Sequence, residues 1–534
     1  MKSNFLKIIF LNLLFISSLF ANSFEEDINK LKTNSLKAKQ EVVNEITEKY
    51  ITDERTNILL SKMLKGELFY TKDNGTFVVL EKKDGSIYNT KTFLENKTLE
   101  PMKKTLLKKV KTNNKLRSVI KTKLAEMNLF SQDIDKRLRS AKNILLNVSI
   151  EFEPIIDKAL GIETDSSVKE KLLEAKTILR AQNLSGEEQI IAVKELSDFI
   201  SSKSLSTLKE ISTTSTNSEE LKKVAFKSII SVETTRSYYA VVEKAFFGLS
   251  LGSVLLLAAI GLAITFGVMK VINMAHGEMM MIGAYTTYTL QQIMPNLIEY
   301  SILIAIPAAF IVSGIVGIII ERLVIRHLYG RPLETLLATF GISLILQQIV
   351  RTIYSPLNQE VKTPSWMSGA LEVNSALSLT YNRLYIIVFA LIVFASILLL
   401  LNKTSLGLKV RAVTQNRQMA QAMGIKTSWI DAMTFGLGSG IAGIAGVALS
   451  QITNVGPNLG QAYIVDSFMV VVFGGVGNLW GTLIGAITLG EINKFIEPVA
   501  GAVLAKVIIL VFIILFIQKR PRGLFPQKGR DAQD

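Results

Sequence analysis

Apolar runs of about twenty residues recur through the second half of this 534-residue chain, between 242 and 518. As helices, such runs span about 30 Å of hydrocarbon, and they suit a membrane because a helix pairs every backbone N–H and C=O group within the segment. We therefore expect an α-helical polytopic membrane protein with about eight membrane segments, some of them broken or re-entrant. The predicted segments are 245–269, 271–290, 302–320, 335–350, 384–401, 432–451, 466–489 and 502–517.

The first half of the chain is much more polar. Residues 1–21 place two lysines before an apolar core and end in small residues, which is the pattern of a secretory signal peptide. An uncleaved anchor helix is the alternative, and either one exports the chain that follows it. We therefore expect 22–241 to be a periplasmic domain, followed by a transmembrane domain at 242–518.

The exported domain combines helical and strand patterns. Around 67–90 the apolar period changes from 3.6 to 2, and an Asn-Gly and an Asp-Gly pair supply residues that accept tight hairpin turns, so we expect a small β-meander there. From about 103 to 230, four segments open with a capping Ser, Thr, Asp or Asn before an apolar stripe. This pattern predicts a mostly α-helical domain, either a solenoid-like stack of helical pairs or an irregular bundle.

Charge indicates the orientation of the spans. Basic residues gather at alternate ends of the apolar runs, at Lys270, at 321–331, at 406–425 and after 518. Because an excess of Lys and Arg marks cytoplasmic loops, we expect 519–534 to be a cytoplasmic basic tail. The formal net charge of +15 then reflects topology, and no nucleic-acid partner is expected. The chain has no cysteine, which excludes disulfides and thiolate metal sites.

Two apolar segments, 271–285 and 471–486, are interrupted. Each has an apolar arm, a break with glycine and a polar side chain, and a second arm ending in Ile-Gly-Ala. Polar groups are costly at membrane depth, and paired breaks of this kind occur at the midplane sites of transporters with inverted repeats. We expect both breaks to line a substrate path, with the candidate residues Asn273, His276, Glu278, Gly474, Gly475 and Asn478.

Other roles for these residues stay open. The alternative is that the polar side chains hydrogen-bond neighbouring helices or freed backbone groups. His276 lies among several methionines, as in a soft-metal site, but no Met or His spacing recurs elsewhere, so we expect no metal site and no cofactor in this chain. The run 436–446 carries small residues at four-residue spacing, which favours close helix packing.

The sequence lacks the signatures of an enzyme. No GxxxxGK[ST] loop occurs, so any ATP must be hydrolysed by partner subunits. No nucleophile-base constellation or carboxylate pair stands out in the polar half of the chain. We therefore expect no catalytic residue and no enzymatic activity.

A basic and polar island, LGLKVRAVTQNRQMAQAMGI at 406–425, separates the apolar runs 384–401 and 432–451. Its part from 411 to 425 resembles the cytoplasmic coupling loop of ATP-binding-cassette (ABC) importer permeases, in the version of the branched-chain amino-acid permease family. The segment INMAHGEMMMIGAY is similar to that family as well, and the resemblance covers about 245–525. It implies that ATPase subunits dock on the island, with the coupling residues Arg411, Gln415, Asn416, Ala420 and Gly424.

Within that family, the segment 466–486, the tail that begins at Ile517 and the long exported domain are similar to the urea permeases. The resemblance implies urea import across the bacterial inner membrane, with a homologous second permease, two cytoplasmic ATPase subunits and a periplasmic substrate-binding protein. Lys270 departs from the family, which more often has a small residue there. The alternatives are a permease for branched-chain or other small amino acids, a channel or ion-driven carrier, and a membrane-tethered scaffold.

Overall fold

The computed structural model describes four stretches of the chain, namely 24–50, 53–84, 87–94 and 96–525. The predicted signal peptide and most of the predicted basic tail lie outside these stretches. The chain divides into two compact units, Met1–Thr235 and Arg236–Asp534, and each is described by itself. The division falls within one helix, α10 (Glu219–Met269), a few residues before the expected boundary at 241.

The first part of the first unit contains two capped helices and an antiparallel sheet. The side chains of Ser35 and Asp53 cap α2 (Leu36–Lys49) and α3 (Glu54–Lys65). The strand order is β4-β3-β2-β1-β5. The predicted meander corresponds to the first three strands, whereas the last two are too short to show an apolar alternation in the sequence. The strands are β1 (Leu68–Thr71), β2 (Phe77–Asp84), β3 (Ile87–Thr92), β4 (Met102–Lys103) and β5 (Leu107–Lys109).

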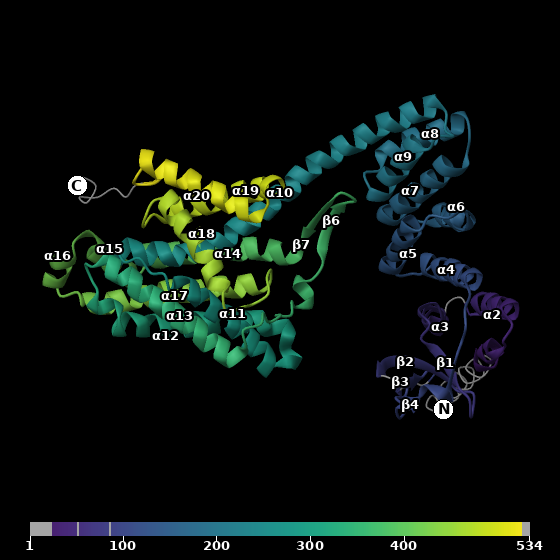
Figure 1. Cartoon of the computed structure of the whole chain (residues 1–534), viewed down its shortest axis with the longest axis horizontal. Helices are drawn as coiled ribbons and strands as arrows, with labels where there is room; N and C mark the ends of the chain where they lie inside the picture. Colours follow the sequence, from purple (N-terminus) through teal and green to yellow (C-terminus); the bar gives the residue numbers. More distant parts are fainter. Residues whose placement is uncertain (1–23, 51–52, 85–86, 95, 526–534) are drawn as a thin grey trace, which may run out of the picture. The chain divides into compact units, whose positions relative to one another are not determined.

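Helices make up the rest of the first unit. Asp133, Asp165 and Ser201 accept hydrogen bonds from the first turns of α5, α7 and α9, as expected of helix caps. Helix α7 contacts α5 and α9 as well as α6 and α8, which is the neighbour pattern of stacked helical pairs (Figure 1). The helices are α4 (Asn114–Leu129), α5 (Ile134–Leu146), α6 (Glu153–Ile162), α7 (Ser166–Asn183), α8 (Glu187–Glu195) and α9 (Ser202–Thr213).

The second unit is a bundle of apolar helices with one short hairpin. The hairpin, β6 (Ala370–Asn374) and β7 (Leu377–Thr380), lies between the predicted segments 335–350 and 384–401. After α10, the helices are α11 (His276–Ile293), α12 (Ile298–Leu323), α13 (Pro332–Tyr354), α14 (Tyr381–Lys403), α15 (Ser405–Gln415), α16 (Arg417–Ala422), α17 (Thr427–Ser450), α18 (Leu459–Gly474), α19 (Leu479–Ala500) and α20 (Ala502–Lys519).

Among the described residues, six helical segments are long and apolar enough to cross a membrane. They contain α10, α12, α13, α14, α17 and α20, and they match six of the eight predicted segments. The predicted segment 271–290 becomes extended chain followed by α11, whose polar residues lower its hydropathy. The predicted segment 466–489 falls on two separate helices, α18 and α19, of which α18 is apolar but shorter than the six spanning helices. The break expected at 474–478 is therefore a turn between two packed helices.

Helix α17 is the centre of the second unit, and most of its residues are buried. It packs on α11 and α12, whose backbones approach it at glycines. A Cβ added at Gly446 would lie 1.9 Å from the carbonyl oxygen of Met280 on α11, and one at Gly283 would lie 2.0 Å from that of Gly443. The small residues of 436–446 thus serve close packing.

Candidate functional site

The interruption of the segment 271–285 places the start of α11 beside the middle of the apolar part of α10. The His276 side chain bonds through Nε2 to the carbonyl oxygen of Ala258 at 3.0 Å. Ala258 lies eleven residues before the end of α10 at Met269, about 16 Å along the helix axis. The chain therefore turns at Lys270, which has a positive φ of 53°, and runs back beside α10 before α11 begins. Glycine, which lacks a Cβ atom, adopts this left-handed conformation more easily than lysine does.

Asn273 shapes the extended stretch before α11. Its side-chain Oδ1 accepts a hydrogen bond from the backbone N–H of Ala275 at 3.0 Å, and the residue is almost fully buried. The backbone N–H of Met274 donates to Thr339 Oγ1 on α13 at 3.1 Å. Freed backbone groups are thus paired within the protein, as irregular chain at membrane depth requires.

Glu278 lies in the first turn of α11, and its residue is 1% exposed. Its Oε1 accepts hydrogen bonds from Ser343 Oγ and Gln347 Nε2 on α13, both at 2.8 Å. Its Oε2 is buried and has no hydrogen-bond partner among the described residues, and the same holds for Nδ1 of His276. Because leaving a buried polar atom unpaired costs free energy, these two atoms are candidate contacts for a ligand group.

Sequence reasoning missed the face of α13 that holds Glu278. Polar residues recur on this helix at four-residue spacing, and the first four are buried. Residues four apart share one side of a helix, so the spacing alone places a polar row on one face of an otherwise apolar span. The row consists of Thr335, Thr339, Ser343, Gln347 and Arg351.

The second break has different neighbours. Asn478 caps α19 by accepting from the N–H of Gly481 at 3.1 Å, and it donates to the carbonyl oxygen of Phe525 at 3.3 Å. The carbonyl oxygen of Gly474 accepts from the N–H of Phe525 at 3.1 Å. Gly475 has a φ of 106°, and a Cβ there would meet the Phe525 carbonyl oxygen. The break thus packs against the segment that follows α20.

The structure separates the six candidate path residues into two groups. Asn273, His276 and Glu278 lie at the start of α11, with Glu278 bonded to α13. Gly474, Gly475 and Asn478 instead contact the segment after α20, and the neighbouring Gly477 packs against Gly267 near the end of α10. No hydrogen bond or ion pair between the described residues of the two groups is present. Their common membership of one path stays a prediction.

The basic island forms two short helices, α15 and α16. Asn416 lies between them and caps α16 by accepting from the N–H of Met419 at 2.9 Å. Ala420 is buried against Val410 and Val413 of α15 and Ile430 of α17. Gly424 ends α16 with a φ of 85°, and a Cβ there would meet no atom within 4 Å. Arg411 and Gln415 are exposed on α15.

An ion pair fastens α16 to α17. Arg417 binds the fully buried carboxylate of Asp431 with two hydrogen bonds, and its guanidinium lies 4.9 Å from the ring centre of Tyr329. The hydrogen bond to Asp431 raises the pKa of Arg417. The side chains of Met419 and Met423 are exposed, at 60% and 77%. The island therefore exposes apolar and basic side chains on a helix that is held to α17 by an ion pair.

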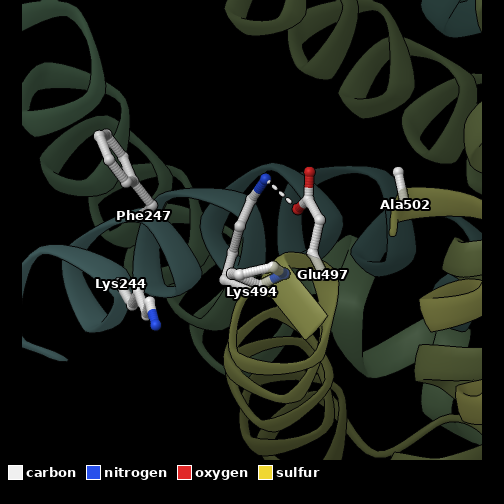
Figure 2. A pocket seen from close by; sticks show the side chains of 6 residues that line it. Lys244, Phe247, Lys494, Glu497 and Ala502 are labelled. Carbon is white, nitrogen blue, oxygen red and sulfur yellow. Dashed lines mark hydrogen bonds and ion pairs between the residues drawn. The ribbon is translucent and has the colours of Figure 1, made fainter. Parts of the chain in front are cut away.

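A shallow pocket of about 450 Å³ lies elsewhere in the second unit. Figure 2 shows Lys244 and Phe247 of α10 on one side, and Lys494 and Glu497 of α19 on the other, joined by an ion pair of 2.6 Å. The pocket contains none of the residues predicted from the sequence. Among the described residues, no group of three or more His, Asp or Glu side chains is arranged to hold a metal ion.

Residues 244–517 match a protein-family model described as branched-chain amino acid transport system / permease component. The chain is 30% identical over 286 residues to the high-affinity branched-chain amino acid transport system permease protein BraD of Pseudomonas aeruginosa, covering 52% of this chain and 93% of that protein. It is 29% identical over 293 residues to LivH of Salmonella typhimurium, covering 53% and 94%. The ribose import permease protein RbsC of Escherichia coli is 26% identical over 227 residues, covering 41% and 68%. No solved structure gives a significant match.

Proposed function

The chain belongs to the family of branched-chain amino acid transport system permease components, and from this premise we propose that it is the membrane-spanning component of an ABC importer for a branched-chain or other small amino acid. The observation that carries the proposal is the match over the second half of the chain to permeases named for these substrates, which takes in 93% of BraD. The names of the relatives support an amino acid better than urea.

Urea is the second candidate substrate. The match to BraD takes in only 52% of this chain, so the first half is additional to that relative. A long domain before the permease is one of the features by which the sequence resembles urea permeases. Urea is neutral and presents two NH2 donors and one carbonyl acceptor, so it too suits a path lined by carboxylate and amide groups.

We propose that the substrate meets the start of α11. The free Oε2 of Glu278 is an acceptor suited to the ammonium group of an amino acid, and Asn273 and His276 border the same turn. Gly474, Gly475 and Asn478 are proposed to flank the inner end of the path, because the second break packs against the segment after α20. In this proposal the substrate reaches Glu278 only when helices separate, since the carboxylate is buried.

The island at 406–425 is the proposed docking surface for two cytoplasmic ATPase subunits, which hydrolyse ATP on behalf of the permease. The exposed Met419 and Met423 support this role, because exposed apolar side chains mark interaction surfaces. A second, homologous permease and a periplasmic substrate-binding protein complete the proposed importer. The chain would lie in the bacterial inner membrane, with the first unit in the periplasm and the C-terminus in the cytoplasm.

Competition for uptake tests the substrate. Vesicles that contain the permease and its partner subunits are supplied with labelled leucine, and unlabelled urea, isoleucine or ribose is added in large excess. We expect isoleucine to abolish the uptake of label and urea and ribose to leave it unchanged. Saturable uptake of labelled urea that leucine does not inhibit would replace the amino acid with urea.

A further inference from the structure

The pocket of Figure 2 lies where several membrane helices begin or end. The apolar part of α10 starts directly after Lys244, α14 starts at Tyr381, α19 ends at Ala500 and α20 starts at Ala502. In a membrane protein the ends of the spans lie at the level of the lipid headgroups, where basic and aromatic side chains gather. The pocket therefore opens at the boundary between hydrocarbon and water.

The charges around the pocket do not cancel. Lys494 and Glu497 neutralise each other. Lys244 forms no hydrogen bond or ion pair with any residue that the structure describes. The guanidinium of Arg383 lies 4.7 Å from the ring centre of Phe247, and it forms no ion pair with a described carboxylate, although the charge of Glu497 acts on it. Glu491 is the nearest further acid on α19, but it packs against Gly248 and does not line the pocket.

An apolar stripe continues from the same place. Val499 on α19 and Val503 and Val507 on α20 are 90%, 77% and 48% exposed. Val503 follows directly after Ala502, which lines the pocket, and the four-residue spacing keeps Val503 and Val507 on one face of α20. A ligand that fills both features must carry an anionic group and long apolar chains.

We propose that this pocket is a binding site for an anionic phospholipid. The phosphate group lies between Lys244 and Arg383, and the acyl chains lie along the stripe formed by Val499, Val503 and Val507. Lys244 and Arg383, neither of which forms an ion pair with a described carboxylate, favour a lipid with a net negative charge over one whose headgroup is zwitterionic. A soluble phosphate or carboxylate would use the cations and leave the stripe uncovered.

Native mass spectrometry of the full chain in detergent tests the site. The protein is titrated with phosphatidylglycerol or phosphatidylcholine, and the affinity for the first lipid bound is measured. We expect phosphatidylglycerol to bind about tenfold more tightly, and the double variant Lys244→Gln, Arg383→Gln to remove this preference, since each basic residue near a membrane surface contributes to attracting anionic lipid. Lys403→Gln, at the opposite end of α14, is the matched control and keeps the preference.

Three results overturn the proposal. The double variant binds phosphatidylglycerol as the unaltered chain does, or Lys403→Gln weakens binding equally, which would indicate a general belt of cations. Soluble glycerol phosphate displacing the lipid at equal concentration would indicate a site for free anions.

A second variant, Val503→Ser with Val507→Ser, keeps the cations, and we expect weaker lipid binding from it. Thermal unfolding of each variant shows that the chain is folded.

Discussion

The two carboxylate oxygens of Glu278 have different surroundings, although both are buried. Oε1 accepts from Ser343 and Gln347 at 2.8 Å, whereas Oε2 has no described partner. The two hydrogen bonds fix the carboxylate and direct its free oxygen. Glu278 was among the residues expected from the sequence because a carboxyl group at membrane depth is costly. The residues that hold it were missed, because no single polar residue in α13 stands out.

The side chain of Gln347 is predicted to matter for transport, whereas that of its neighbour Gln348 is not. Gln347→Ala removes one of the two donors to Glu278, and we expect the KM for substrate to rise by about tenfold, the usual effect of losing a hydrogen bond to a charged group. Gln348 is exposed on the same helix, so Gln348→Ala is the matched control. Uptake kinetics measure the KM of each variant, and equal KM values for the two variants would contradict the role assigned to Gln347.

Replacing Arg417 is predicted to destabilise the protein more than replacing its ion-pair partner Asp431. The carboxylate of Asp431 is fully buried, whereas Arg417 is 39% exposed. Arg417→Gln leaves a buried charge without its partner and is expected to destabilise the second unit by about 3 kcal/mol. Asp431→Asn leaves a cation that water reaches, so its effect should be smaller. Thermal unfolding of the full chain measures both, and a larger loss for Asp431→Asn would refute the asymmetry.

The sequence predicted the long, continuous apolar helices well. It predicted the interrupted membrane segments only in part. The runs that became α12, α14 and α20 are continuous and apolar, so length alone identified them. The start of α11 was not predictable, because the hydrogen bond from His276 to Ala258 depends on how two helices pack. Strands β4 and β5 were missed because two or three residues cannot show a period.

The packing of α17 on α11 is predicted to tolerate no side chain at Gly446. A Cβ there would lie 1.9 Å from the Met280 carbonyl oxygen, so Gly446→Ala forces the helices apart and should cost about 1–3 kcal/mol. Gly341 on α13 has no atom within 4 Å of such a Cβ. Gly341→Ala is therefore the control and is expected not to lower the melting temperature, because alanine favours a helix more than glycine does. Equal melting temperatures for the two variants would disprove the close approach.

The end of α16 is predicted to couple ATP hydrolysis to transport. Gly424 has a φ of 85°, and a Cβ there would meet no atom within 4 Å, so Gly424→Ala strains only the backbone, by about 1–2 kcal/mol, on the proposed docking surface. Gly501, with a φ of 80° and equally open surroundings, bears the same strain between α19 and α20. We expect Gly424→Ala to reduce uptake per ATP hydrolysed and Gly501→Ala to leave that ratio intact. A similar ratio in both variants would remove the coupling role from Gly424.

The chain as a whole has two halves. The second half matches the permease family, and the match to BraD does not extend to the first half. The family match spans 244–517, and the matched part of this chain covers 93% of BraD. The sequence predicted this division from composition and predicted the family from the island and the first break. The resemblance to urea permeases pointed to urea, whereas the relatives are named for branched-chain amino acids. The residues alone do not separate the two substrates, because leucine and urea both present N–H donors and the pattern of helices carries no information on which is bound.

This permease is proposed to move its substrate only when ATPase subunits drive it. The decisive experiment is uptake of labelled leucine into vesicles that contain the full chain, with and without the ATPase subunits and with ATP or a non-hydrolysable analogue. We predict accumulation against a gradient only with the subunits and ATP together. Uptake that proceeds equally without the ATPases would refute the proposal and would identify a channel or an ion-driven carrier.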